Sequence, residues 1–135
     1  MTKSYQHEKH FSIAEALQTL YKYHPLLEKM QDLAHKLIKD GIDLQAAGFP
    51  ENPENLKLSQ LVVKDYQQLL EVIEALTREG ILVKGVEEGL IDFPHIRKSG
   101  EEVYLCYKLG EQTIQFWHGL QDGFSGRQPL ENLES

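Results

Sequence analysis

Four residues in the last third of the chain have side chains that could bind or activate a ligand: Asp92, Glu111, His118 and Arg127. Glu111 and His118 are seven residues apart, so they would share one face of a short helix. Asp92 lies within an apolar segment, where a carboxylate needs a partner. Two carboxylates and an imidazole form a ligand set that suits zinc, iron or manganese. With three protein ligands, a fourth position would remain open for water, as in metal hydrolases.

A structural role also accounts for these four residues. Arg127 would form ion pairs with Asp92 and Glu111 and fasten the C-terminal tail to a sheet. His118 would then interact with the C-terminal end of its helix. Since structural ion pairs commonly produce such clusters, the sequence favours this interpretation over a metal site. In the metal-site alternative, Arg127 would orient an anionic substrate.

Aromatic residues are concentrated in the same part of the chain. Most should lie in the core, but an exposed one would anchor a partner or form the wall of a pocket. The candidates for this role are Tyr104, Tyr107, Trp117 and Phe124. The single cysteine, Cys106, lies in an apolar alternating segment and is predicted to be a small buried hydrophobic residue.

The segment before these residues has the pattern of two amphipathic helices. Ser12 to Glu15 matches a capping box, and apolar residues then recur at helical spacing as far as Leu37. Pro25 interrupts this pattern and predicts a kink. A loop rich in Gly, Pro and Asn follows, over residues 41–55, before the second helix. Residues 11–80 are therefore predicted to form a helical hairpin, after a frayed N-terminus over residues 1–10.

Residues 81–135 change to the period of β-strands. Three short strand patterns separated by turns predict an antiparallel meander, and residues 111–118 predict a short helix before an irregular tail. The sequence thus predicts one α+β domain over residues 1–135. It would contain a long antiparallel helical hairpin, with its first helix kinked at Pro25, a three-stranded antiparallel β-meander and a short C-terminal helix.

The composition excludes some classes of function. The chain has 135 residues and a net charge of −7, which argues against a protein that binds nucleic acid. No apolar segment approaches the ~20 residues that span a bilayer, and the N-terminus lacks the apolar core of a signal peptide. One cysteine cannot form an internal disulfide. We therefore expect a cytoplasmic protein that binds neither nucleic acid nor a membrane.

Several short motifs resemble a family of small bacterial proteins that is catalogued as a domain of unknown function. They are Gly89–Pro94 (GLIDFP), Val103–Tyr107 (VYLCY), Leu109–Glu111 (LGE), Trp117–His118 and Gly126–Leu130 (GRQPL). The resemblance covers nearly the whole chain. Tyr107 stands where the family is expected to have a tryptophan, which is a conservative exchange. The resemblance implies the outline of the fold and no activity.

Two functions follow from these patterns. The sequence favours a non-enzymatic interaction or scaffold module that works as a homodimer. A helix from Ser12 to Lys39 would be ~40 Å long, and a three-stranded meander could not cover two such apolar helices. The alternative is a divalent-metal-binding protein or metal-dependent hydrolase that uses Asp92, Glu111 and His118. Binding of a small ligand without catalysis in the same cleft remains open.

Overall fold

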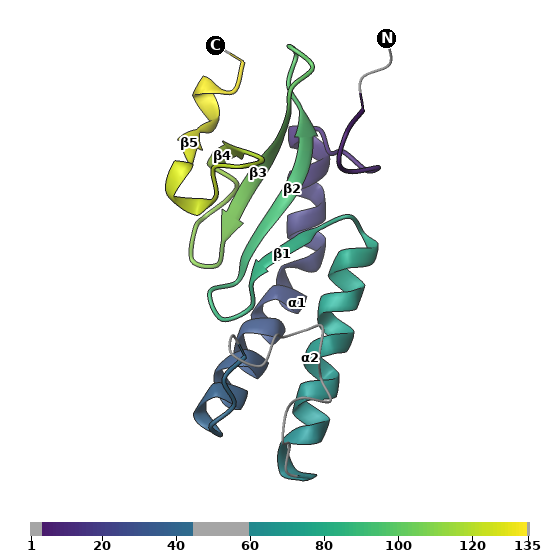
Figure 1. Cartoon of the computed structure of the whole chain (residues 1–135), viewed down its shortest axis with the longest axis vertical. Coiled ribbons are helices and arrows are strands. Elements are labelled where there is room, and N and C mark those ends of the chain that lie inside the picture. The colour runs from purple at the N-terminus through teal and green to yellow at the C-terminus, as the bar shows by residue number, and fades with distance from the viewer. Residues whose placement is uncertain (1–3, 45–59, 135) are drawn as a thin grey trace.

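The structure is a computed structural model that describes residues 4–44 and 60–134. Within these residues the chain forms two α-helices followed by a five-stranded antiparallel sheet (Figure 1). The helices are α1 (Ile13–Lys39) and α2 (Gln60–Arg78). The strands are β1 (Leu82–Gly85), β2 (Leu90–Ile96), β3 (Glu102–Lys108), β4 (Phe116–Gly119) and β5 (Gln128–Pro129). Neither helix is long and apolar enough to cross a membrane.

The start of α1 agrees with the sequence pattern. The Ser12 hydroxyl accepts a hydrogen bond from the Glu15 amide, and the Glu15 carboxylate accepts one from the Ser12 amide. This capping box satisfies two of the free amides at the helix start. Pro25 lies inside α1, which continues through it as one helix. Most of the predicted loop over residues 41–55 lies outside the described residues.

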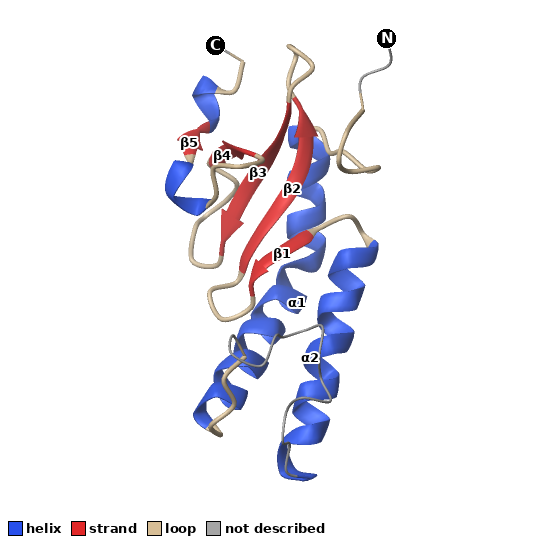
Figure 2. Cartoon of the chain, in the orientation of Figure 1, coloured by secondary structure: helices blue, strands red, loops and turns tan. Residues whose placement is uncertain are grey.

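The prediction of a three-stranded meander was wrong. The three predicted strands correspond to β1, β2 and β3, but β4 and β5 extend the sheet in the order β1-β2-β3-β4-β5. The predicted short helix at residues 111–118 was also wrong. Of that segment, residues 116–118 belong to β4, and the described residues after β4 contain only 3-10 turns besides β5 (Figure 2).

The physical reason for this error is the period of the side chains. Trp117 pairs with Leu105 and His118 pairs with Tyr104 in neighbouring positions of β3. Successive residues of a strand point to opposite faces, so Trp117 joins the core while His118 lies on the other face. The seven-residue spacing of Glu111 and His118 was compatible with a helix, but residues 116–119 form a strand because their backbone pairs with β3.

One face of the sheet packs on the helices and forms the core. Figure 1 shows α1 passing behind β2 and β1. The strand residues of this core include Ile91, Phe93, Val103, Leu105 and Trp117. The alternate residues of the same strands point to the second face. That face therefore carries Asp92, Tyr104, Cys106 and His118.

The N-terminal segment is held by a buried carboxylate, whereas the sequence predicted a frayed end. The Glu102 carboxylate accepts hydrogen bonds from the backbone amides of Gln6, at 2.8 Å, and His7, at 3.1 Å. His10 Nε2 lies 2.7 Å from the same carboxylate. These bonds attach residues 6–10 to the first residue of β3, a contact between positions more than 90 residues apart.

Candidate functional site

Three chemically different side chains meet on the second face of the sheet: Asp92 from β2, Cys106 from β3 and His118 from β4. One donor atom from each residue lies within 4.8 Å of the donor atoms of the other two. His118 Nε2 is 3.1 Å from Asp92 Oδ1. All three residues are buried. A carboxylate, a thiol and an imidazole therefore share one small buried volume.

The strand register brings these residues together. Asp92 is directly opposite Cys106 in the β2–β3 pair. His118 is opposite Tyr104 in the β3–β4 pair, which places it diagonally across from Cys106. Diagonal neighbours on one face of a sheet are close enough for long side chains to touch. The pairing of the strand backbones alone thus places these three residues next to one another.

Both nitrogens of His118 face acceptors. Nδ1 is 2.9 Å from the carbonyl oxygen of Gly119, and Nε2 faces the Asp92 carboxylate. A neutral imidazole has one N–H donor, whereas an imidazolium has two. In the absence of another cation, the two acceptors therefore favour the charged ring. If a metal ion bound at Nε2, the Nδ1–H bond to the carbonyl would orient the ring for it.

The pKa values follow from burial and from the Asp92 charge. Burial lowers the pKa of His118, but the hydrogen bonds to Asp92 and Gly119 outweigh it, so the pKa of His118 is raised. Burial, and after it the negative charge of Asp92, raises the pKa of Cys106 far above its usual range. Cys106 is therefore a neutral thiol unless a cation binds beside it, which argues against a role as a free nucleophile.

A pocket of about 100 Å³ opens above this group. Asp92, Cys106 and His118 form its buried floor. Two exposed side chains, Lys84 and Phe124, stand at its rim. The remaining lining residues are Leu90, Tyr104, Leu120 and Gly123. The three buried donor atoms are thus connected to the surface by a small cavity.

Glu111 belongs to a different group from Asp92 and His118. Its carboxylate pairs with Arg127 and also accepts a hydrogen bond from the Lys108 amide at 2.7 Å. The Arg127 guanidinium lies 3.9 Å from the centre of the Phe116 ring. These contacts fasten the C-terminal segment to the sheet, as the structural interpretation of the sequence expected for Glu111. Arg127 Nη1 is buried without a hydrogen-bond partner among the described residues.

The four candidate aromatic residues divide between the two faces. Tyr104 lines the pocket, and its hydroxyl lies 2.7 Å from His7 Nε2. Phe124, at the pocket rim, is 46% exposed. Tyr107 and Trp117 are buried on the core face. Phe124 is thus the most exposed member of this set.

Sequence reasoning did not place two residues in the site. Cys106 was predicted to be a small buried hydrophobic residue, and its burial is confirmed, but its place among the donor atoms was not predicted. Lys84 was not considered. The alternation within Val103–Tyr107 places Cys106 on the face opposite Leu105, which could have been recognised. Lys84 gives no comparable indication, because its position depends on how β1 pairs with β2.

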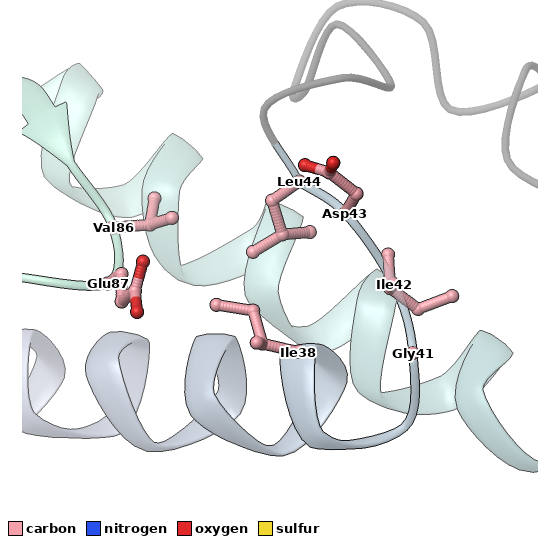
Figure 3. A pocket seen from close by; sticks show the side chains of 7 residues that line it. All are labelled: Ile38, Gly41, Ile42, Asp43, Leu44, Val86 and Glu87. Carbon is pink, nitrogen blue, oxygen red and sulfur yellow. The ribbon is translucent and has the colours of Figure 1, made fainter.

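Two other pockets are lined by fewer kinds of reactive side chain. The first, of about 330 Å³, lies where the end of α1 meets the turn after β1 (Figure 3). Its lining consists of Ile38, Gly41, Ile42, Asp43, Leu44, Val86 and Glu87. The second, of about 660 Å³, is a mainly apolar groove lined by Leu17, Leu20, Tyr21, His24, Pro25, Tyr107, Gln112 and Thr113. Neither lining contains a thiol, and neither brings an imidazole and a carboxylate together as a set of donors.

Comparisons with known proteins agree with the resemblance noted in the sequence. Neither the curated proteins nor the solved structures contain a match to this chain. A family model described as "Uncharacterized conserved protein (DUF2203)" matches residues 9–130. That range includes every strand of the sheet and all the residues of the candidate site. The predicted membership in a domain of unknown function is therefore confirmed, and the chain belongs to the DUF2203 family of uncharacterized conserved proteins.

Proposed function

We propose that this protein binds a zinc ion through Asp92, Cys106 and His118, with a fourth position open toward the pocket. The observation that supports this proposal is the convergence of three different buried donor atoms within 4.8 Å of one another. Three protein ligands with one open position are typical of catalytic zinc sites, whereas structural sites are closed by four. A metal-dependent hydrolase is the class of enzyme that such a site would suit.

The cysteine is the reason for choosing zinc. Carboxylates and imidazole alone would also suit iron or manganese, but a thiolate favours a softer ion. Zinc bonds of about 2.0–2.3 Å in tetrahedral geometry place neighbouring donor atoms about 3.3–3.6 Å apart. The present separations are at most 4.8 Å, so movements of about 1 Å would complete the coordination.

Charge balance supports a divalent ion. A bound zinc would take the place of the proton on His118 Nε2 and of the Cys106 thiol proton. The Asp92 carboxylate and the Cys106 thiolate would then neutralise its two positive charges. Because up to two protons leave as the ion binds, zinc affinity should rise with pH. The buried group would be electrically neutral both with the ion and without it.

Elemental analysis of protein purified without an affinity tag or a chelator tests the proposal. We expect near-stoichiometric zinc in the wild type and its loss in Cys106→Ser and His118→Gln. Glu111→Gln is the matched control, because Glu111 was a candidate ligand in the sequence but lies in the Arg127 ion pair. Metal-stripped protein should recover one zinc per chain on titration. Failure to take up zinc, or equal uptake by all the variants, would contradict the proposal.

A second proposal concerns self-association. Three large apolar side chains follow one another at four-residue steps along α1 and remain exposed: Ile13 (37%), Leu17 (37%) and Tyr21 (87%). Such a stripe can pack against its own copy across a twofold axis, so we propose that it forms the interface of a homodimer. The mass in light scattering at micromolar concentration should be that of a dimer, and Tyr21→Glu should reduce it. A strictly monomeric wild type would exclude this interface.

A further inference from the structure

Lys84 occupies an irregular position in the sheet. In the β1–β2 pair, Leu82 is opposite Asp92 and Val83 is opposite Ile91, but the next pair is Gly85 with Leu90. Lys84 is therefore the extra residue of a β-bulge. Bulges redirect a side chain and are frequent beside functional sites. The Lys84 side chain lines the pocket, where Lys84 Nζ lies 4.7 Å from the centre of the Tyr104 ring.

The ammonium group of Lys84 is not paired with a carboxylate in the described part of the chain. The nearest acid of the pocket, Asp92, faces His118 at 3.1 Å. Lys84 therefore brings a positive charge to the wall of the pocket. A negative ligand would neutralise this charge.

The size of the cavity limits the ligand to a small group. Its volume of about 100 Å³ corresponds to roughly three water molecules at ~30 Å³ each. This suits a single phosphate, sulfate or carboxylate group. Leu90, Leu120 and Phe124 supply apolar walls, which strengthen a charged hydrogen bond by lowering the local dielectric constant. The exposed rim provides the route of entry.

We infer that this pocket binds a small oxyanion, which contacts Lys84 at the rim and the open position of the zinc ion at the floor. The zinc contact rests on the proposed function, whereas the Lys84 contact depends only on the place of Lys84 in the pocket lining. The substrate class of the site would accordingly be an anionic group, such as a phosphate or a carboxylate.

Calorimetric titration tests this inference with inorganic phosphate and, separately, with acetate as the two sources of an oxyanion. Each would be added to zinc-loaded and to metal-stripped protein. Lys84→Met should weaken the binding of the preferred anion by roughly tenfold or more, because a charge-assisted hydrogen bond is lost. The matched control is Lys22→Met. Lys22 Nζ also lies over a tyrosine ring, at 5.4 Å, but it is on α1 and is not part of the pocket lining.

The outcomes separate the two proposals. Binding of either anion that Lys84→Met weakens and Lys22→Met does not would support the inference, and the tighter anion would identify the class. The same result in protein that takes up no zinc would support the Lys84 contact and refute the zinc site. Stoichiometric zinc with no binding of either anion would refute the anion site alone. Binding that both lysine variants leave unchanged would refute the role of Lys84.

Discussion

Two histidine–carboxylate pairs in this protein have nearly the same length but opposite exposure. His118 Nε2 lies 3.1 Å from Asp92, with side chains 4% and 1% exposed. His24 Nδ1 lies 3.2 Å from Glu28, with side chains 40% and 62% exposed. A double-mutant cycle on each pair, in metal-stripped protein, would measure the coupling free energy of the buried pair and of the exposed pair. The substitutions are Asp92→Asn with His118→Gln, and Glu28→Gln with His24→Gln.

The expected magnitudes follow from the distances and the surroundings. At about 3.1 Å and an effective dielectric constant of about 20, two opposite unit charges attract by about 5 kcal/mol, against about 1 kcal/mol in water. Desolvation offsets part of the buried term. We expect a coupling free energy of about 3 kcal/mol for Asp92–His118 and less than about 1 kcal/mol for His24–Glu28.

Urea unfolding followed by the fluorescence of Trp117 is the assay, because Trp117 is the only tryptophan of the chain and is 5% exposed. The pKa of His118 is raised in the folded protein. Its stabilising effect is therefore complete below the unfolded pKa of about 6.5 and is lost as the pH rises through the higher folded value. The coupling should be larger at pH 6 than at pH 9. Equal couplings for the two pairs, or a buried coupling that grows with pH, would refute this reasoning.

Three further predictions concern residues that stabilise the fold around the site. Burial raises the pKa of Glu102, but hydrogen bonds from a histidine and two backbone amides outweigh it, so the pKa is lowered from its ordinary value of 4.5. The charged Glu102 carboxylate should therefore stabilise the fold above pH 4.5, and this stabilisation should be lost as the pH falls through the folded pKa. Glu102→Gln should remove about 1–3 kcal/mol at neutral pH and speed amide exchange at residues 6–7. Gly89→Ala should destabilise more than Gly110→Ala in thermal unfolding, by about 1–3 kcal/mol. Both glycines have positive φ, but a Cβ at Gly89 would lie 2.4 Å from a leucine side chain, whereas the space at Gly110 is open. Arg127→Lys should lower the unfolding free energy by about 1–2 kcal/mol, since lysine cannot keep both the aromatic stacking and the paired carboxylate; an unchanged urea midpoint would contradict this.

Several features of the fold could be read from the chain because they depend on neighbours in sequence. The capping box of Ser12 and Glu15 needs only a three-residue spacing. The alternation of β3 and the apolar period of α1 also arise within single segments. The expectation that Asp92 needs a partner came from the same kind of reasoning, since a carboxylate among apolar strand residues is rarely left alone. The family resemblance rested on short motifs of this local kind.

The composition of the candidate site was decided by contacts between distant segments. His118 became a strand residue because β3 supplied a partner, and the strand register then selected Cys106, in place of Glu111, as the third donor beside Asp92. Lys84 reaches the pocket only because β1 pairs with β2. The sequence by itself thus determined the helices, the first three strands and the concentration of reactive residues in one block. Only the tertiary structure decided which of those residues meet, because strand pairing and register join positions that no local spacing relates.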